Sequence, residues 1–245
     1  MLLCILLAPA LYAQDDVANV PCQDLKVAGN VQQRYFLIGA KEGDKAPDAG
    51  YALLLILPGG DGSAEFSPFV KRIWQNALPP GYLVAQLVAV GSENKNQIVW
   101  PTAKDNEPRQ KFKTEEFIRN VVNEVKAKHK IDESKIYALA WSSSGPAVYA
   151  TMLSKENPLT GAFVAMSVFM PARLPALTAA KGQHYYLLQS PQDRVTKYTF
   201  AKTAKTQLTN AGAKVELKDY EGGHGWHGDV FGTIHAGIEW LEQQK

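Results

Sequence analysis

Short apolar runs recur along the chain and alternate with segments in which apolar residues follow a helical spacing. Runs rich in β-branched and aromatic residues are typical of strands buried on both faces. The strands expected from this pattern are Tyr51–Leu57, Gly81–Val90, Ile136–Trp141, Gly161–Phe169, His184–Ser190 and Lys214–Glu221. Helices are expected between them, among them Glu65–Ala77, a helix capped by Thr114, and Lys197–Ala211. Strands alternating with helices predict an α/β fold with a mostly parallel sheet covered on both faces.

Two other segments are expected at the margins of this sheet. The stretch from Leu25 to Gly39, which turns around Asn30, predicts an antiparallel hairpin at a sheet edge. The connector that contains Pro171 and Pro175 is too short to fold as a cap. We therefore expect no sizeable cap domain and an open site, which favours extended or polymer-borne substrates.

Composition narrows the class of protein. The chain has 245 residues, of which 46% are apolar and 20% charged, with a formal net charge of +2. This length and balance suit one globular domain with one sizeable core. The chain contains no run of basic residues interleaved with aromatic residues, which is the pattern that would indicate nucleic-acid binding. We expect a single catalytic domain over residues 25–245.

The first residues form an apolar run that is too short to span a bilayer and is followed by small residues. Residues 1–13 are therefore expected to be a signal peptide, cleaved after Ala10 or Ala13, and the mature protein to be secreted or periplasmic without a stable membrane anchor. An N-terminal helix packed on the core is the alternative. Loss of Cys4 with the peptide would leave Cys22 alone, which excludes an internal disulfide and a cysteine-based metal site.

The stretch Lys135–Tyr149 passes without a linker from a strand pattern into a helix pattern across three serines. A serine at such a corner is lifted into the open, next to the N–H groups of a helix N-terminus. Ser142 is favoured over Ser143 as a nucleophile because the residues two before and two after it are small, whereas Trp141 lies two before Ser143. A plain helix N-cap is the alternative for this corner.

Glycines cluster directly after one central strand, in Pro58–Ser63. This cluster is either a turn or a loop whose backbone N–H groups face a neighbouring strand end, because glycine keeps side chains out of the way. No Lys-Ser or Lys-Thr pair follows, so it is not a phosphate loop. Gly60 and Asp61 are the candidate donors of such an N–H group.

Two polar residues follow later strands. Asp193 lies just past the strand ending at Ser190 and precedes a helix, where an aspartate is usually a cap. His224 lies between glycines in the loop after the last strand, a position that packing explains poorly. Ser142, Asp193 and His224 therefore occur in the chain order of a nucleophile, an acid and a base, each at the carboxyl end of a strand.

Tryptophans supply candidate walls for a substrate site. Trp100 lies in the long polar loop Ser92–Lys113, where it is either a hydrophobic plug or a substrate contact. Trp141 directly precedes the candidate nucleophile, and Trp226 lies two residues after the candidate base. All three are candidates for the wall of the site.

From about Leu25 to its end the chain resembles an α/β-hydrolase and is most similar to the secreted esterase, dienelactone-hydrolase and polyhydroxybutyrate-depolymerase-like groups. The resemblance rests on four motifs: Pro-Gly-Gly-Asp-Gly from residue 58, Ala-Trp-Ser-Ser-Ser-Gly from 140, Ser-Pro-Gln-Asp-Arg-Val from 190 and Tyr-Glu-Gly-Gly-His-Gly-Trp from 220. Ala140 and Ser144 stand where the elbow motif has glycines, and Pro58 where the family often has histidine.

The chemistry expected from these residues is ester hydrolysis through an acyl-enzyme. Ser142 would attack a small-molecule or polymer-borne ester, His224 would take its proton, and Asp193 would hold the imidazole. The backbone N–H of Ser143 and that of Gly60 or Asp61 would bind the oxyanion. No metal or organic cofactor is expected. Alternatives are a serine peptidase of the same fold and a catalytically silent binding protein; a cysteine nucleophile of the dienelactone type is discounted because no cysteine lies at the elbow.

Overall fold

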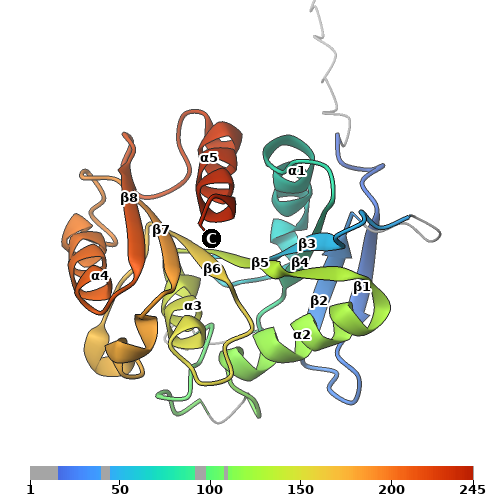
Figure 1. The fold of residues 1–245 in the computed structure, drawn as a ribbon, viewed down its shortest axis with the longest axis horizontal. Helices are drawn as coiled ribbons and strands as arrows, with labels where there is room; N and C mark the ends of the chain where they lie inside the picture. Colours follow the sequence, from blue (N-terminus) through green and yellow to red (C-terminus); the bar gives the residue numbers. More distant parts are fainter. Residues whose placement is uncertain (1–15, 40–44, 92–97, 108–109, 245) are drawn as a thin grey trace, which may run out of the picture.

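The computed structural model describes residues 16–39, 45–91, 98–107 and 110–244 (Figure 1). One eight-stranded sheet runs through the molecule in the order β1-β2-β4-β3-β5-β6-β7-β8. The β1–β2 and β2–β4 pairs are antiparallel and all the other pairs are parallel. The strands are β1 (Cys22–Lys26), β2 (Arg34–Ile38), β3 (Tyr51–Leu57), β4 (Tyr82–Leu87), β5 (Ile131–Trp141), β6 (Gly161–Ala165), β7 (His184–Gln189) and β8 (Lys214–Asp219).

Helices cover both faces of this sheet. In Figure 1, α1 and α5 lie on one face, with α2 and α3 on the other. The α-helices are α1 (Ser67–Ala77), α2 (Thr114–Lys128), α3 (Gly145–Met152), α4 (Tyr198–Asn210) and α5 (Val230–Glu242). The mostly parallel sheet with helices on both faces is confirmed, as is the edge hairpin, which β1 and β2 form.

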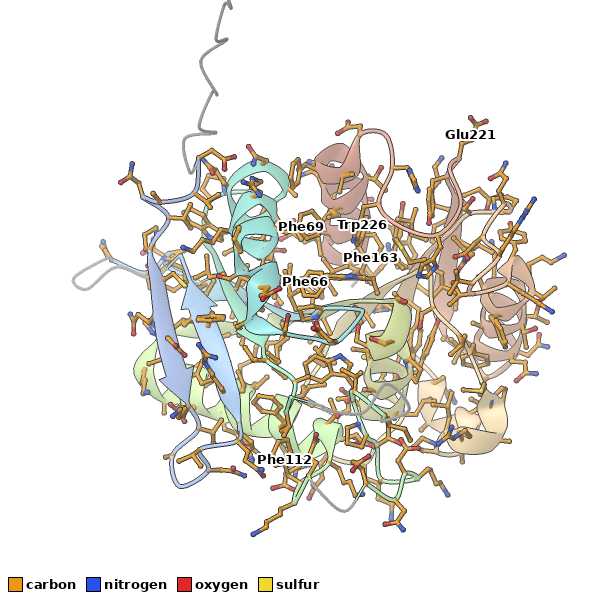
Figure 2. All side chains as sticks on the ribbon, turned by 180° about the vertical axis from the view of Figure 1, so that it is seen from behind. Phe66, Phe69, Phe112, Phe163, Glu221 and Trp226 are labelled. Atoms are coloured by element: carbon orange, nitrogen blue, oxygen red, sulfur yellow. The ribbon has the colours of Figure 1, made fainter. Side chains whose placement is uncertain are left out.

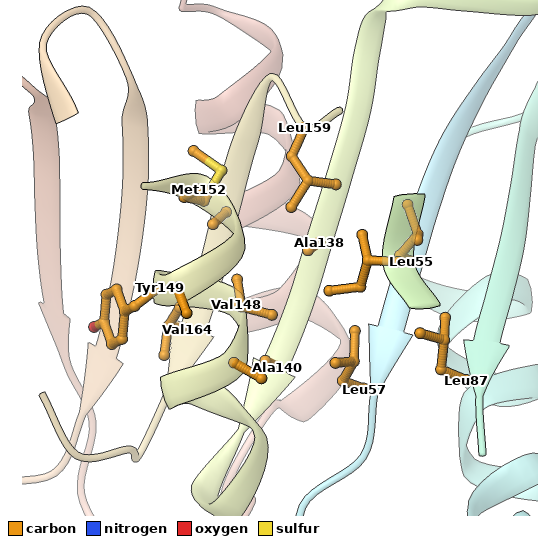
Figure 3. Packing of buried hydrophobic residues seen from close by; sticks show 14 of the residues in the cluster. Leu55, Leu57, Leu87, Ala138, Ala140, Val148, Tyr149, Met152, Leu159 and Val164 are labelled. Carbon is orange, nitrogen blue, oxygen red and sulfur yellow. The ribbon is translucent and has the colours of Figure 1, made fainter. Parts of the chain in front are cut away.

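Alternate residues of the central strands supply two separate cores. Leu53, Leu55 and Leu57 of β3 face α2 and α3, whereas Leu54 and Ile56 face α1 and α5. All five are fully buried, which explains why their strand is an uninterrupted apolar run. Figure 3 shows the first core, with α3 laid against β5 and β6. Burial of each such side chain contributes about 1.5–3 kcal/mol to folding, so the ends of these strands are firmly held.

Two boundaries differ from the sequence prediction. The strand expected to run to Phe169 ends at Ala165, because Met166 has a φ of +39° and the chain leaves the sheet there. Thr114 is not the cap of α2. It is the first helical residue, and its hydroxyl donates a hydrogen bond to the Pro101 carbonyl instead, 2.9 Å away.

The parallel strands bring several loops to one edge of the sheet. The loops after β3, β5, β7 and β8 all begin at carboxyl ends of strands, where open α/β sheets bind ligands. The connector after β6 holds two short 3₁₀ helices, Pro171–Arg173 and Leu177–Ala180, and no cap domain. The predicted signal peptide lies outside the described residues. Within the described ranges, no helix is both long and apolar enough to cross a membrane.

Candidate active site

Ser142 sits at a sharp corner between β5 and α3. Its φ is +56°, a left-handed conformation that is unfavourable for any residue other than glycine. Residues held in such a conformation recur at functional sites. Its carbonyl accepts a hydrogen bond from the Ser167 hydroxyl at 2.6 Å. Gly145 makes room for this contact, because a Cβ there would lie 2.1 Å from Ser167 Oγ. The corner is therefore built by its neighbours as well as by its own sequence.

The three adjacent serines have different partners. The Ser142 hydroxyl lies 3.0 Å from His224 Nε2. The exposed Ser143 hydroxyl donates to the Gly60 carbonyl at 2.9 Å. The buried Ser144 hydroxyl lies 2.6 Å from the Leu57 carbonyl and 3.0 Å from the Trp141 N–H. Ser142 is thus the one of the three whose hydroxyl meets an imidazole.

His224 links Ser142 to Asp193. Its Nδ1 lies 2.8 Å from Asp193 Oδ2, so the structure brings together the three side chains that the sequence singled out. The Asp193 side chain is fully buried and the His224 side chain is 24% exposed. A carboxylate on one nitrogen and a hydroxyl on the other is the arrangement that allows an imidazole to remove the serine's proton.

Asp193 is held by a network that sequence reasoning missed. Its Oδ1 accepts hydrogen bonds from the N–H groups of Val195 and Thr196 at 2.8 and 2.9 Å. Its Oδ2 accepts from Thr196 Oγ1 at 2.7 Å and from Gln189 Nε2 at 2.8 Å. The signal for Thr196 is its spacing, because an aspartate often bonds the backbone two and three residues on. Gln189 carried no such signal.

These bonds decide the pKa of Asp193. Burial raises the pKa of the carboxyl, but the hydrogen bonds that it accepts from His224, Thr196 and Val195 outweigh burial. The pKa of Asp193 therefore ends below its ordinary value. The carboxylate stays ionised beside the imidazole, as a partner that stabilises imidazolium must.

Glycines and Tyr220 shape the loop that carries His224. Gly222, Gly223 and Gly225 all have positive φ, which a residue with a side chain rarely adopts. The Tyr220 hydroxyl donates to the Gly223 carbonyl at 2.7 Å. The Gly223 N–H lies 3.2 Å from Ser190 Oγ, which ties this loop to the loop of Asp193. The two loops therefore hold their side chains in one fixed relation.

The glycine-rich loop after β3 lies against the elbow. A Cβ at Gly59 would lie 2.5 Å from Trp141 Cδ1, so only glycine fits there. The Gly62 N–H donates to the Gly59 carbonyl at 3.0 Å and closes a turn in which Gly60 has a φ of +60°. The segment is therefore a turn that packs against the end of β5 at Trp141.

The direction of one carbonyl distinguishes the candidate oxyanion donors. The Gly60 carbonyl points to the Ser143 hydroxyl. The N–H of Asp61 belongs to the same trans peptide group and so points the opposite way. This geometry argues against the Asp61 N–H and leaves that of Gly60 as the candidate. The Ser143 N–H lies in the first turn before α3, where N–H groups have no intrahelical partner.

A small pocket adjoins the elbow. Its volume is about 170 Å³, and Ser143 forms part of its lining, whereas Ser142, Asp193 and His224 do not. Its walls come from α3, from the loop that contains Trp100 and from the connector after β6. They are mostly apolar, through Ile98, Trp100, Tyr149, Val168, Met170 and Leu174. The connector after β6 is thus one wall of this pocket.

The three tryptophans occupy different surroundings. Trp100 lines this pocket while its indole N–H donates to the Pro58 carbonyl at 3.0 Å. Trp141 is 5% exposed and packs edge-on against Trp226, with ring centroids 5.8 Å apart. Phe66 and Phe69 complete this aromatic cluster, and Figure 2 shows both of them near Trp226. The position of Trp141 is accounted for by packing, whereas that of Trp100 combines packing with exposure to the pocket.

The remaining histidines have other surroundings. His129 directly follows α2, His184 begins β7, and His235 Nδ1 lies 3.0 Å from the Ala77 carbonyl. His227 stacks near Tyr220. Among the described residues, no three histidine, cysteine or acidic side chains cluster in a way that could hold a metal ion.

Comparisons with known proteins show which fold this architecture belongs to. No family model matches the sequence, and no curated protein resembles it significantly. Solved structures do match. A Bacillus cereus carboxylesterase superposes with a TM-score of 0.64 at 19% identity, over 86% of this chain and 94% of its own.

Two further structures extend the comparison. MGS-M1, an α/β-hydrolase enzyme from a Medee basin deep-sea metagenome library, gives a TM-score of 0.65 at 13% identity, over 91% of this chain and 97% of its own. Thermogutta terrifontis esterase 2, phosphonylated by sarin, gives 0.63 at 14% identity, over 93% and 94%. With the sheet order and the helices on both faces, these similarities show that the chain has the α/β-hydrolase fold.

Proposed function

We propose that the protein is a serine hydrolase that cleaves carboxylic esters through an acyl-enzyme on Ser142. The observation that carries this proposal is the continuous contact from Ser142 Oγ to His224 Nε2 and from His224 Nδ1 to Asp193, at a corner where Ser142 has a φ of +56°. The fold is shared with esterases, which supports the reaction class without establishing it.

In the first half of the reaction, Ser142 Oγ attacks the ester carbonyl carbon. A proton on His224 Nδ1, donated to Asp193, leaves Nε2 free to accept the serine's proton as the new C–O bond forms. The carbonyl π electrons move onto oxygen. When the tetrahedral intermediate collapses, Nε2 returns the proton to the leaving alkoxide, and the alcohol departs. Ser142 then carries the acyl group as an ester.

In the second half, water takes the place of the alcohol. His224 Nε2 accepts a proton from the water as its oxygen attacks the acyl carbon, and gives it to Ser142 Oγ as the acyl-enzyme breaks. The products are a carboxylic acid and the free hydroxyl. Each step uses groups that the chain itself supplies.

The N–H groups of Ser143 and Gly60 are the proposed donors to the oxyanion. Each donor of this kind typically contributes about 3–4 kcal/mol to stabilising the transition state. The Ser143 hydroxyl has a structural role as well, because its hydrogen bond to the Gly60 carbonyl fixes the loop that carries the second donor. The sequence alone had assigned Ser143 only a backbone role.

Labelling with a fluorophosphonate tests the proposal, because such a probe reacts with an activated serine whatever the substrate is. We expect one adduct, mapped to Ser142 by peptide mass and lost in Ser142→Ala and His224→Ala. Ser143→Ala and Ser144→Ala are matched controls, since each removes a neighbouring hydroxyl and should keep the adduct. A folded protein that takes no label, or takes it on another serine, would rule the proposal out.

A short ester and a peptide amide with the same acyl group separate an esterase from a serine peptidase. We expect hydrolysis of the ester with little or none of the amide. Preferential cleavage of the amide would assign the same three residues to a peptidase.

We also propose export from the cytoplasm through residues 1–13. Sequencing the N-terminus of the protein recovered from its natural host should then begin at Leu11 or Gln14.

A further inference from the structure

The pocket beside Ser143 lies on one definite side of the reacting bond. In ester hydrolysis the leaving oxygen must approach His224 Nε2, because that nitrogen returns the proton to it. His224 does not line the pocket, whereas Ser143, the neighbour of the nucleophile on the oxyanion side, does. A substrate whose leaving oxygen lies at His224 Nε2 would therefore extend its acyl group, and not its alcohol, towards the pocket.

We propose that this pocket is an acyl site limited to groups of about six carbons, an inference that rests on the proposed esterase function. Its volume is about 170 Å³. A dry apolar cavity of roughly 150 Å³ in another protein binds benzene, which sets the scale of the occupant. A linear acyl chain up to hexanoyl or a benzoyl ring fits this space, and a decanoyl chain does not.

The walls of the pocket are held in place by contacts outside it. Trp100 is fixed by the bond from its indole N–H to the Pro58 carbonyl. The Tyr149 ring packs edge-on against Phe169 with centroids 5.0 Å apart, and it lies tilted against Tyr185 at 6.1 Å. The apolar Ile98 and Met170 are 37% and 38% exposed, so they border its mouth. Fixed apolar walls favour an apolar chain of limited size over a polar one.

An ion pair ties together two of the segments that line the pocket. Arg173, from the connector after β6, pairs with Asp105, from the loop of Trp100, and both line the pocket. The Asp105 carboxylate is anchored in turn by the Thr102 N–H at 2.8 Å and the Thr102 hydroxyl at 2.9 Å. We assign to this pair the role of fixing the separation of the walls and so the length limit.

The test uses p-nitrophenyl esters from acetyl to decanoyl, so that the alcohol is constant. While the chain fits, each methylene that enters the pocket should raise kcat/KM by about fourfold. We expect kcat/KM to rise up to about hexanoyl and to gain nothing further from hexanoyl to decanoyl, since methylenes that stay outside the pocket contribute no burial. A flat series, or one that still rises to decanoyl, would overturn the acyl site and leave the esterase proposal standing. No hydrolysis of any ester, with no fluorophosphonate adduct, would overturn both.

Variants test whether the pocket sets the limit on acyl-chain length. Val168→Phe fills it and should lower the hexanoyl-to-acetyl ratio of kcat/KM by about tenfold or more. Val31→Phe is the matched control, because Val31 is 74% exposed in the edge hairpin and should leave the ratio unchanged. Arg173→Ala should raise the decanoyl-to-hexanoyl ratio several-fold, while Arg173→Lys, which can keep the pair, should stay close to wild type. An unchanged ratio in Val168→Phe would show that the pocket does not bind the acyl group. An unchanged ratio in Arg173→Ala would show that the ion pair does not set the length limit of the acyl chain.

Discussion

The buried hydroxyl of Ser144 donates a hydrogen bond to the carbonyl of Leu57, 2.6 Å away, and so joins the elbow after β5 to the end of β3. The same oxygen lies 3.0 Å from the Trp141 N–H, which makes it the acceptor of a second bond. Ser144 stands where the elbow motif has a glycine. Its side chain therefore connects two neighbouring strands that a glycine would leave unconnected at this point.

We expect Ser144→Ala to lower the free energy of unfolding by about 1–3 kcal/mol, because it leaves a buried N–H and a buried carbonyl each without this partner. Urea denaturation followed by tryptophan fluorescence measures the change. Ser143→Ala, on the exposed side of the same turn, should cost less than half as much. Equal losses in the two variants would contradict the structural role given to Ser144.

Ser143→Ala should reduce esterase activity slightly. It leaves the backbone N–H but removes the bond from the hydroxyl to the Gly60 carbonyl. The loss of one such bond predicts a fall in kcat/KM of about two- to tenfold, seen in initial rates with a short ester. Ser142→Ala, by contrast, should lower kcat by about 10⁴–10⁶. Near-complete inactivation of Ser143→Ala would mean that the nucleophile has been assigned to the wrong serine.

Gly59→Ala is expected to disrupt the elbow. The new Cβ would lie 2.5 Å from Trp141 Cδ1 and 2.6 Å from the Trp141 carbonyl, and the carbonyl is backbone that cannot swing aside. Thermal unfolding should show a markedly lower Tm together with loss of activity. The control is Gly29→Ala. Gly29 has a positive φ, +78°, but nothing lies within 4 Å of the new methyl group, so only a small cost of about 1 kcal/mol is expected.

The lowered pKa of Asp193 predicts how stability depends on pH. A carboxyl whose pKa is lower in the folded than in the unfolded protein stabilises the fold above its unfolded pKa, about 3.9. This contribution disappears as pH falls through the folded pKa. The Tm difference between wild type and Asp193→Asn should thus be largest near neutral pH and shrink below about pH 4. A difference that grows towards acid pH would show that Asp193 is not held as an ion.

Local patterns were sufficient to predict most of the fold. The strand Tyr51–Leu57 was predicted with the bounds that it has, because a strand covered on both faces needs apolar residues throughout. The edge hairpin was signalled by its turn. The choice of Ser142 followed from crowding at the elbow, and the three side chains meet because parallel strands end at one edge of the sheet. These results depend on periodicity and chain order, both of which a single sequence contains.

The contacts that refine the site depend on the packed structure and were not predictable. The Ser143 hydroxyl reaches Gly60 across 83 residues of sequence, and Ser144 reaches Leu57 across 87. Gln189 looked like the end of a strand, yet its amide bonds Asp193. Thr114 looked like a cap because its residue type suits one, but the Pro101 carbonyl competes for its hydroxyl. Such bonds are made between segments whose separation only the folded sheet determines.

At Ser142, which has a left-handed backbone, the requirements of stability and of catalysis conflict. A non-glycine residue held at such a φ costs on the order of 1–3 kcal/mol, most of which a glycine would recover. Ser142→Gly would therefore be expected to resist heat better than the natural protein while lacking the hydroxyl. A directed-evolution campaign that scored variants for thermostability alone would then drift towards an inert protein at this residue, so any such screen needs a catalytic filter from its first round.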